Sequence, residues 1–476
     1  MSIIKTYQDL VAVGLDEKVR MQFIESVIND HRSSKKYRDA AVANEYYAKR
    51  NVTISQFQKF LYTMSGKKVS DIYSANYKTK TAFFRSMVIQ QTQYVLSNGI
   101  TFAKSDTKDK LGRDFDYQIQ TAAKKAMIDG VSFCFFNFDH VEVFGFADTP
   151  SCPGFAPLYD EDTSLLRAGV RYWYSGTDGQ NVLHATLYEE DGYATYIHKH
   201  GSDMEQVDTK RGYIKTATST ADNLISEVAY SNYPSFPIIP LYANDLHESE
   251  LNGLRESIDC YDYIKNGLAN DIDDTAGIYW TIKNSGGFDD DDMVKFLDRL
   301  RVVKAASVSA DDAEVESHTV DVPVEARSTM LEILRTDLYK DAMLLNVSEL
   351  SASAKTATEI RAAYQPQDDK CGDFEYHISN AIYKILQLIG VEDEPAYKWN
   401  RIANMTEETQ MVMLAANYLD DETILNHLPW ITPEEVDDIL KRRDAEDLNR
   451  LGMTAQGTPQ NALRQATEPE KVNEDE

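Results

Sequence analysis

Apolar residues recur at helical spacing in two long stretches of the second half of the chain, residues 245–276 and residues 323–346. Steps of three, four and seven residues place them in one stripe along each helix. The first stripe consists of Leu251, Leu254, Ile258, Tyr261, Leu268 and Ile272, and the second of Met330, Leu334, Leu338, Ala342 and Leu345. The pattern predicts two long helices that each bury one face and run antiparallel to each other.

The ends of these predicted helices carry their own signals. Asp245 and Glu248 form an acidic capping box, because both carboxylates can accept hydrogen bonds from the unpaired N–H groups of a first turn. Gly277 would end the first helix, and Pro323 fits the first turn of the second because its missing N–H would be unpaired there. At about 1.5 Å per residue the first helix would be roughly 45 Å long, which is longer than a small domain is wide.

Residues 277–322, between the two helices, combine strand and helix patterns. We expect strands at 279–283, near 301–305 and at 315–322, and a helix on which Met293, Phe296, Leu297 and Leu300 share one face. The insert is therefore predicted to be a small α/β cap. Residues 347–358, after the second helix, are small and weakly apolar. They predict a mobile loop, although a plain connector between two helices also fits these residues.

The first half of the chain changes from a helical to a strand period near Val131. Helices are predicted at 19–29, 37–50, 77–96 and 109–129, and strands at 131–138, 141–146, 170–174, 182–188 and 193–198. Asp-Gly pairs at 178–179 and 191–192 favour hairpin turns, so we expect an antiparallel meander. Prolines at 234, 237 and 240 are expected to close it, since proline cannot continue the interior of a ladder.

The last part of the chain is predicted to be helical. Residues 357–390 form one helical pattern, which Pro366 should kink or split. Residues 405–445 predict at least two further short helices, and the polar stretch from Gly452 lacks the apolar content to fold alone. The fold class expected from the whole chain is α+β and mainly helical.

Charge decides which partners are plausible. The 476 residues, enough for two to four modules, include 49 Lys and Arg against 77 Asp and Glu, a net charge of −28. A protein that binds phosphates tightly normally has a basic surface, so tight binding of nucleic acid is not expected here. A nucleic-acid partner would be one that has to slide past the protein. The carboxylates of the two long helices are either a solvated polar face or an acidic surface in an assembly.

The motifs of common enzymes are missing from the sequence. Gly66-Lys67 has Leu61 and Lys68 where a phosphate-binding loop needs glycine and Ser or Thr. Asp271 and Asp273 precede a glycine that is one place late for a calcium loop. Asp289 to Asp292 could hold a divalent ion, but at the start of a helix they fit dipole capping better. His198 and His200 share a strand face without a third ligand.

Cysteine spacing and hydropathy set the expected environment. Cys134, Cys152, Cys260 and Cys371 lie far apart without a CxxC pair, so neither a zinc site nor a disulfide framework is predicted, and a reducing cytosol fits. The N-terminus has no signal pattern and no run of eighteen apolar residues occurs. We therefore expect no membrane association, and no cofactor or metal.

Several segments resemble the portal proteins of tailed bacteriophages, the ring-shaped head-to-tail connectors at one capsid vertex. They are residues 239–244 (IPLYAN), 270–274 (NDIDD) leading into 282–284 (IKN), 353–357 (SAKTA), and 420–429 (DDETILNHLP) with 434–439 (EEVDDI). These segments cover roughly residues 235–445, and their order and spacing carry the resemblance.

The resemblance implies a portal-like ring subunit, with twelve copies in the virion around an axial channel. Its regions would be a wing of helices and antiparallel β-structure at 1–245, stem helix 1 at 246–276, a clip at 277–322, stem helix 2 at 323–346, a tunnel loop at 347–358, a kinked wing helix and connection at 359–404, crown helices at 405–451 and a disordered tail at 452–476.

The resemblance also assigns roles to single residues. The DNA-facing residues of the tunnel loop would be Ser351, Ala352, Ser353, Ala354, Lys355 and Thr356, with Lys355 as the candidate phosphate contact. The acidic residues expected to line the channel are Glu256, Asp259, Asp271, Asp337 and Asp341. The residues expected to dock partners at the clip are Asp289, Asp290, Asp291, Asp292 and Arg299.

The implied partners are other copies of the chain, double-stranded DNA in the channel, the terminase large subunit, major capsid and scaffolding proteins, and head-completion or tail proteins. The implied location is the portal vertex of the virion, and the host cytoplasm during assembly. Two alternatives fit the residues: a metal-dependent phage nuclease or processing enzyme that uses the acidic clusters, and another acidic structural protein of the virion.

Overall fold

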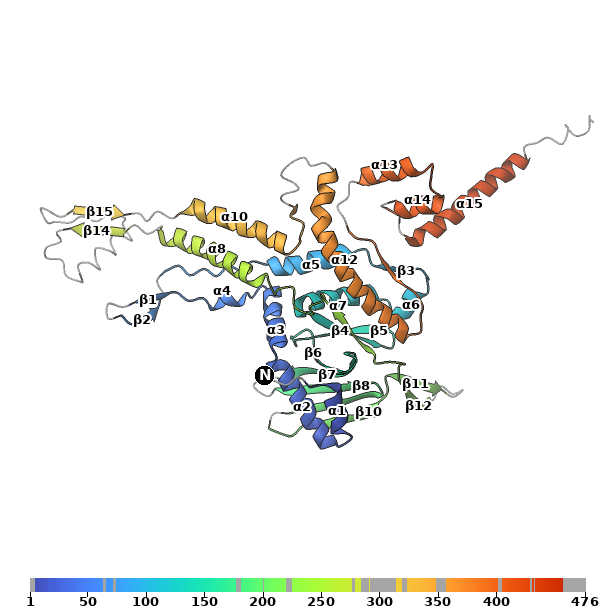
Figure 1. Ribbon diagram of the computed structural model, residues 1–476, viewed down its shortest axis with the longest axis horizontal. Helices are drawn as coiled ribbons and strands as arrows, with labels where there is room; N and C mark the ends of the chain where they lie inside the picture. Colours follow the sequence, from blue (N-terminus) through green and yellow to red (C-terminus); the bar gives the residue numbers. More distant parts are fainter. Residues whose placement is uncertain are drawn as a thin grey trace, which may run out of the picture. The chain divides into compact units, whose positions relative to one another are not determined.

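The computed structural model describes residues 5–62, 66–71, 74–176, 181–199, 201–219, 225–275, 279–283, 291, 314–318, 323–347, 357–400, 405–428, 430–431 and 433–456. The chain divides into two compact units, Met1–Asn400 and Arg401–Glu476. Helices and strands are mixed in the first unit, whereas the second is helical (Figure 1).

The helices of the first unit are α1 (Tyr7–Val13), α2 (Glu17–Ser33), α3 (Lys35–Tyr47), α4 (Val52–Gln56), α5 (Phe83–Leu96), α6 (Thr107–Leu111), α7 (Phe115–Asp129), α8 (Arg255–Thr275), α10 (Val324–Asp341) and α12 (Ala357–Leu388). Its strands are β1 (Phe60–Tyr62), β2 (Lys68–Ser70), β3 (Ile100–Phe102), β4 (Val131–Asn137), β5 (His140–Gly145), β6 (Gly154–Tyr159), β7 (Leu166–Ser175), β8 (Val182–Glu189), β9 (Gly192–His198), β10 (Glu205–Arg211), β11 (Ile214–Ser219), β12 (Ile225–Ser231), β13 (Ile238–Tyr242), β14 (Tyr279–Lys283), β15 (Glu314–His318) and β16 (Pro395–Tyr397). The second unit contains α13 (Met405–Ala415), α14 (Asp421–His427) and α15 (Pro433–Gln456).

The first unit is built on a sheet of eight strands in the order β10-β9-β8-β7-β6-β5-β4-β13. Neighbouring strands pair antiparallel, except that β5 and β6 pair in parallel at Gly145 and Gly154. The hairpin predicted at residues 191–192 is confirmed, because Glu189 pairs with Gly192 between β8 and β9. Of the strands in this sheet, the sequence pattern misses β6, β10 and β13.

The prediction that the prolines end the sheet is wrong. Pro240 lies inside β13, opposite Phe133 of β4. Strand β13 is at the edge of the sheet and pairs on one side only. An edge strand tolerates a residue without an N–H group, since its outer side needs no ladder hydrogen bonds.

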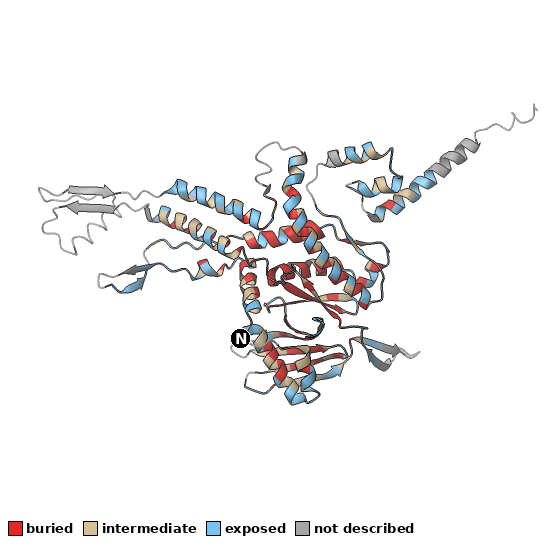
Figure 2. Cartoon of the chain, in the orientation of Figure 1, coloured by how far each residue is buried: buried red, intermediate tan, exposed pale blue. Residues whose placement is uncertain are grey.

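Strand β4 lies at the centre of the packing because both of its faces are buried. Cys134 and Phe136 face the core formed with α5, α7 and α12, whereas Phe133 and Phe135 face a second core with β5 and β6. Successive strand residues point to opposite faces, so burial on both sides explains the nearly continuous apolar sequence. A third core joins α1 and α2 to β6 through β9. Figure 2 shows the concentration of buried residues in α7 and the strands beside it.

The N-terminal helices differ from the prediction at their starts. Helix α5 begins at Phe83 rather than at residue 77, and residues 77–81 are extended. Helix α7 begins at Phe115, after the separate short helix α6. The chain turns between these two helices at Gly112. Only glycine fits there, because its φ is 93° and a Cβ would lie 2.1 Å from the Asp139 carbonyl oxygen.

The first of the two long helices is shorter than the sequence predicts. Helix α8 has 21 residues and begins at Arg255, which gives a length of roughly 32 Å. The predicted capping box at Asp245 and Glu248 does not form, because residues 245–254 are in turns. The Asn244 side chain instead accepts a hydrogen bond from Glu248 N–H (3.2 Å) and donates one to the Glu248 carbonyl oxygen (3.0 Å).

The turn before α8 is bonded to the end of α7. Ala243 N–H donates to the Gly130 carbonyl oxygen and Glu250 N–H donates to the Met127 carbonyl oxygen, both at 3.0 Å. Gly130 ends α7 in the left-handed conformation, as its position after the pattern predicts, and a Cβ there would lie 2.8 Å from the His247 carbonyl oxygen. Glycine is therefore required where these two segments meet.

The second long helix, α10, ends at Asp341, and Met343 has a φ of 52° just beyond it. Between α8 and α10, β14 and β15 pair antiparallel with Tyr279 opposite His318. These strands match two of those predicted for the insert. The predicted helix at 293–300 and the strand near 301–305 lie outside the described residues.

Helix α12 continues through Pro366 over 32 residues, so the proline does not split it. In the second unit, α13, α14 and α15 confirm the predicted C-terminal helices. The predicted disordered tail starts too early, because residues 452–456 belong to α15. The remainder of that predicted tail, residues 457–476, lies outside the described residues.

Candidate functional site on the helix pair α8 and α10

Helix α10 lies beside α8, but it joins the hydrophobic core only at its C-terminal end and in the residues just after it. Leu338, Ala342 and Leu345 are buried, with exposures of 2 %, 0 % and 5 %. Towards the N-terminus of α10 the apolar side chains are exposed to solvent: Ile333 is 49 % exposed and Met330 is 40 % exposed. The predicted stripe is therefore wrong at Met330, because α5 and α12 no longer cover α10 there and α8 alone lies beside it.

An ion pair links the two helices, and a ring contact joins α10 to α5. The Arg327 guanidinium of α10 lies 2.5 Å from the Asp271 carboxylate of α8. At the other end, the rings of Phe83 and Tyr339 meet edge to face with centroids 5.4 Å apart. Asp271 was predicted to line a channel. In the single chain its carboxylate is already paired with Arg327.

Another face of α8 binds an extended segment of the N-terminal half, residues 77–81, which we call the strap. Its alternate backbone N–H groups donate to successive side chains of α8: Tyr77 N–H to Asn270 Oδ1 (2.7 Å), Thr79 N–H to Asn266 Oδ1 (2.6 Å) and Thr81 N–H to Asp262 Oδ1 (2.8 Å). Asn266 Nδ2 also donates to the Thr79 carbonyl oxygen (2.7 Å). We call Asp262, Asn266 and Asn270 the polar row of α8.

The spacing of the polar row fits the strap. Four helical residues rise about 6 Å, and two residues of extended chain span about 6.5 Å. Every second N–H group of the strap therefore meets a side chain one turn further along α8. This match explains why residues 77–82 stay extended although their sequence pattern predicts a helix.

Asp262 is buried, with 0 % exposure, whereas the sequence analysis placed the carboxylates of this helix on a solvated polar face or on an acidic surface of an assembly. Asn51 Nδ2 donates to its Oδ2 at 2.5 Å, so both of its oxygens accept a hydrogen bond. Burial raises the pKa of this carboxyl, and the hydrogen bonds from Asn51 and Thr81 oppose the rise. The group is a structural link between α8 and the N-terminal segments.

Asp259 also differs from its predicted role on a channel surface. Its carboxylate accepts hydrogen bonds from the Tyr46 hydroxyl and from Thr53 Oγ1 (2.6 Å), and its side chain is only 17 % exposed. The carboxylate thus packs against α3 and α4. Glu256, Asp337 and Asp341, by contrast, are exposed on their helices.

The other candidate residues are placed only in part. Asp291 is exposed, while Asp289, Asp290, Asp292 and Arg299 lie outside the described residues. So do Ser351, Ala352, Ser353, Ala354, Lys355 and Thr356 of the predicted tunnel loop, as well as His200. His198 Nδ1 lies 3.0 Å from Glu25 Oε1.

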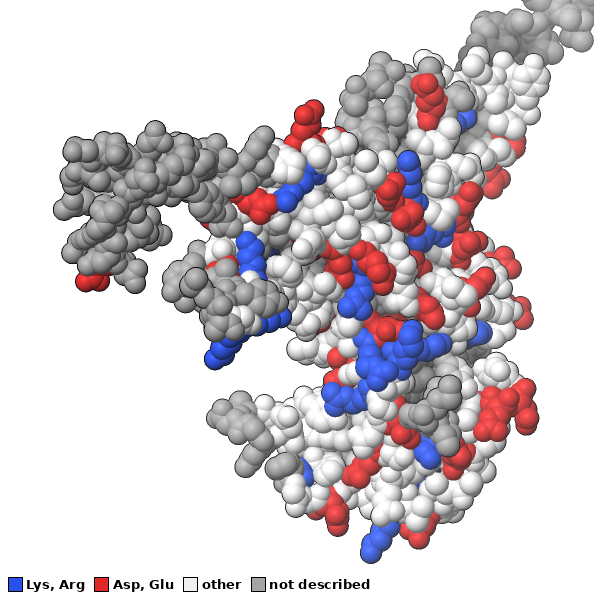
Figure 3. All heavy atoms as spheres, turned by 60° about the vertical axis from the view of Figure 1, so that its left-hand side comes forward, with Lys and Arg blue, Asp and Glu red and all other residues white. Residues whose placement is uncertain are grey.

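Surface charge is mixed on the face seen in Figure 3. Lysines and arginines gather near the middle of that view, and aspartates and glutamates are spread around them. The net charge of −28 is therefore not spread evenly over the surface. An acidic surface has to be assigned helix by helix.

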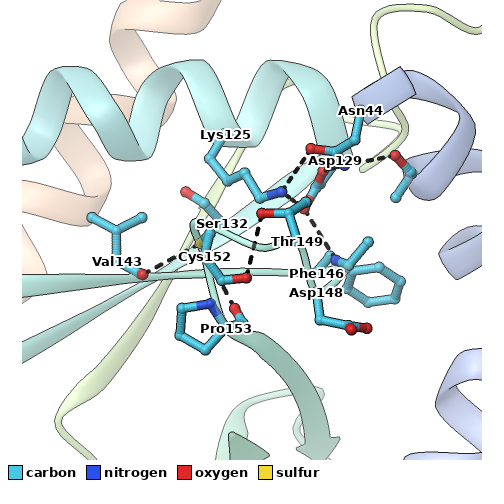
Figure 4. Close-up of polar contacts among 12 residues, drawn as sticks. Asn44, Lys125, Asp129, Ser132, Val143, Phe146, Asp148, Thr149, Cys152 and Pro153 are labelled. Atoms are coloured by element: carbon cyan, nitrogen blue, oxygen red, sulfur yellow. Dashed lines mark hydrogen bonds and ion pairs between the residues drawn. The ribbon is translucent and has the colours of Figure 1, made fainter. Parts of the chain in front are cut away.

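A buried polar cluster that the sequence analysis does not identify joins α3, α7 and the end of β5 (Figure 4). Lys125 Nζ lies 3.1 Å from Asp129 Oδ2 and donates to Asn44 Oδ1 at 2.9 Å. Asn44 Nδ2 donates to Asp129 Oδ1 (2.7 Å), and Ala147 N–H donates to Asp129 Oδ2 (3.1 Å). Gly145 makes room for the lysine, because a Cβ there would lie 2.2 Å from Lys125 Cε.

This cluster lies beside a cleft of about 910 Å³ between α3, α7 and residues 148–152. Burial raises the pKa of Asp129, and the Lys125 charge, the Ala147 N–H group and Asn44 oppose the rise. A satisfied buried pair of this kind fixes the packing of its elements, since removing one partner leaves an unpaired charge. The sequence could have indicated this ion pair, because Lys125 and Asp129 are four residues apart on one predicted helix and are therefore neighbours on its surface.

Comparison with known proteins identifies the class. The chain belongs to the family of phage portal proteins described as SPP1 Gp6-like, whose model matches residues 26–448. Portal proteins are structural, non-enzymatic components of the virion capsid, in agreement with the resemblance found in the sequence. Membership of this family decides against the nuclease alternative.

Two relatives carry the name "Portal protein". One is from Clostridium phage phiCD119, is 26 % identical over 212 residues, and is matched over 43 % of this chain and 47 % of its own length. The other, from Bacillus phage SPP1, is 24 % identical over 342 residues, 70 % of this chain and 66 % of its own length. The matches thus span less than two thirds of each relative.

Among solved structures, a chain in the neck of an empty GTA particle aligns with 72 % of this chain and 88 % of its own length. Its TM-score is 0.39 and its sequence identity 10 %, a similarity from which no conclusion on assembly follows. None of the described helices combines the length and the apolar character that crossing a membrane requires.

Proposed function

We propose that copies of this chain form a ring at one vertex of a phage capsid, through which double-stranded DNA is packaged and later ejected. The observation that carries the proposal is the match of the portal family model to residues 26–448. The open apolar side of α10, with Met330 and Ile333, supports it. A head-to-tail contact repeated by rotation closes into a ring and would cover this side.

In this proposal α8 and α10 are the stem, and exposed carboxylates on them face the channel. Of the five predicted channel residues, Glu256, Asp337 and Asp341 are exposed. Acidic side chains repel DNA phosphates and release no counterions, so the DNA slides instead of binding. Asp271 is paired with Arg327, Asp259 with Tyr46 and Thr53, and Asp337 lies on the apolar face of α10 with Met330 and Ile333, so the role falls mainly on Glu256 and Asp341.

The remaining parts of the proposal follow family resemblance. Residues 347–358 would be the loop that touches DNA, with Lys355 as its one basic residue. Residues 277–322 would be the clip, which meets the terminase large subunit during packaging and head-completion or tail proteins afterwards. The wing would meet capsid and scaffolding proteins, and the ring would hold twelve copies.

Native mass spectrometry and electron microscopy of the purified chain test the proposal directly. We expect a closed ring with a central channel, whose mass gives the number of copies. Deletion of Ser351 to Ala354 should leave the ring intact and reduce DNA filling or retention in an assembled capsid. Single chains at high protein concentration, without any ring, would contradict the proposed function.

A further inference from the structure

The β1–β2 hairpin with its base, residues 59–71, projects from the first unit, and we call it the arm (Figure 1). Both of its ends are fixed to α8. Before the arm, the Phe57 ring meets the Tyr263 ring edge to face with centroids 5.4 Å apart. After the arm comes the strap, whose N–H groups are bonded to the polar row of α8. The arm is therefore held in a set direction by buried polar side chains.

Two further contacts close the base of the arm. Asp71 N–H donates to the Lys59 carbonyl oxygen at 3.0 Å. Lys78 Nζ donates to the Ser55 carbonyl oxygen at 3.1 Å, which joins the chain before the arm to the chain after it. Asp262, which bonds the strap, is buried with a hydrogen bond to each of its oxygens, the condition under which a buried carboxylate is tolerated.

The arm presents an aromatic and basic face. Phe60 pairs with Ser70, and Tyr62 pairs with Lys68, so Phe60 and Lys68 belong to the same face of the hairpin. Lys68 Nζ lies 3.7 Å from the centroid of the Phe60 ring, which is 42 % exposed. The arm contains three lysines and one acidic residue, Asp71 at its base, in a chain with a net charge of −28.

The open face of α10 has the complementary character. Ala326, Met330, Ile333 and Asp337 follow each other at steps of four, three and four, and all four are exposed. Three apolar side chains are thus followed by a carboxylate on one face of the helix. Lys340 and Asp341, of opposite charge, stand at its C-terminal end.

The strap and α10 contact different sides of α8. The residues of α8 that face α10 are Asp271, which pairs with Arg327, Gly267, which lies 3.8 Å from the same guanidinium, and Tyr261, which lines a small cleft with Arg335. At about 100° per residue these positions lie on average about 150° around the helix from the polar row. The arm and the open face of α10 are therefore separate surfaces on different sides of α8, and a head-to-tail contact joins two different surfaces of this kind.

We propose that the arm of each chain docks on the open face of α10 in a neighbouring copy of the chain. Phe60 packs against Met330 and Ile333, and Lys68 moves from the Phe60 ring to pair with Asp337. The contact buries two exposed apolar residues of α10, Met330 and Ile333, and pairs a lysine with a carboxylate. This inference rests on the ring of the proposed function and names one of the contacts between its subunits.

Crosslinking between separately purified variants tests the contact. Lys68→Cys and Ile333→Cys are each made in a Cys260→Ser background, because Cys260 is the exposed native thiol among the four cysteines. The two variants are mixed, allowed to assemble and treated with a short bis-maleimide. We expect covalent dimers in the mixture and none with either variant alone. As a matched control, Ser328→Cys is also exposed on α10 but lies on the side away from the open face, and should give no dimers with Lys68→Cys.

A charge exchange provides a second measurement that does not depend on crosslinking. Lys68→Glu should lower the salt concentration at which rings dissociate, and adding Asp337→Lys should restore it. Native mass spectrometry of the same samples separates the two proposals. Rings that form with no Lys68–Ile333 dimers above the Ser328 control, or with no rescue by Asp337→Lys, would overturn the arm contact alone. Samples without any ring would overturn the proposed function and the arm contact together.

Discussion

Helices α7 and α10 have similar lengths, 15 and 18 residues, but very different burial. In α7, Phe115, Ile119, Ala122, Ala123 and Ala126 are all inaccessible to solvent. In α10, Leu338 is the one buried residue of the helix, and Ile333 is 49 % exposed. Helix α7 buries its apolar face within one chain, whereas α10 leaves apolar side chains exposed. Under the proposed function, α7 stabilises the single chain and the open face of α10 serves assembly.

The sharpest test of this comparison replaces the same residue type in both helices. Ile119→Ala in α7 should lower the free energy of unfolding by about 2–5 kcal/mol, because it opens a cavity in a closed core. Ile333→Ala in α10 should change it by less than about 0.5 kcal/mol, as for other exposed sites. Urea denaturation of the unassembled chain measures both values.

On ring formation, Ile333→Ala should have a larger effect than Ile119→Ala. Rings of Ile333→Ala should dissociate at lower salt or higher dilution than the unaltered chain. If Ile333→Ala destabilised the single chain as much as Ile119→Ala, the contrast between the two helices would be wrong.

Acid should weaken the sheet region through His31. Burial lowers the pKa of His31 to about 4 although its Nε2 contacts the Phe146 carbonyl oxygen at 2.8 Å, and the carboxylate of Asp148 opposes the shift. A folded-state pKa below the unfolded value of about 6.5 gives stability that is present above pH 6.5 and lost as the pH falls towards 4. The full loss would be about 3 kcal/mol.

Denaturation of the unaltered chain and of His31→Gln between pH 7 and pH 4 isolates this contribution. The difference in unfolding free energy between the two proteins should shrink as the pH falls, because the unaltered chain loses the contribution and the variant lacks it. A constant difference across this range would show that His31 is not buried in its neutral form.

Loss of the Asp262 carboxylate should have an intermediate effect. Asp262→Ala leaves Asn51 Nδ2 and Thr81 N–H without their acceptor, which should cost about 1–3 kcal/mol. Asp337→Ala is the control for an exposed carboxylate of the same helix pair. Hydrogen exchange at Thr79 and Thr81 should become faster in Asp262→Ala only, and unchanged protection would contradict the role of the polar row.

The smallest effect is expected at the Arg327–Asp271 pair, whose side chains are 33 % and 38 % exposed. A partly exposed pair of this kind contributes about 0–1 kcal/mol, and the value falls with salt. A double-mutant cycle with Arg327→Ala and Asp271→Ala measures it. A coupling of several kcal/mol would mean that the helix pair is held together more tightly than its exposure indicates.

Much of the fold could be predicted from the period of apolar residues. The strands from β4 to β9 other than β6, and the central parts of α7, α8 and α10, follow their patterns closely. The errors concentrate where distant segments meet. Residues 77–82 have a helical pattern but are held extended by the polar row, and residues 245–254 form turns because they bond to the end of α7.

The candidate site was less accessible to sequence reasoning. Asp259, Asp262 and Glu256 are all acidic residues of one helix, yet the first two bind α3, α4 and the strap while Glu256 is exposed. Net charge and spacing do not distinguish these roles, because burial of a carboxylate depends on which donors the rest of the fold brings to it. Met330 was assigned to the buried stripe for a similar reason: the pattern shows an apolar face but not what covers it.

The junction at Gly130 has a mechanical consequence. Two backbone hydrogen bonds and a contact too close for any Cβ join the end of α7 to the turn before α8. These contacts hold the turn before α8 against the end of α7, so we expect a movement of α8 to carry α7 with it. A side chain at position 130 would force the two segments apart and so weaken this coupling.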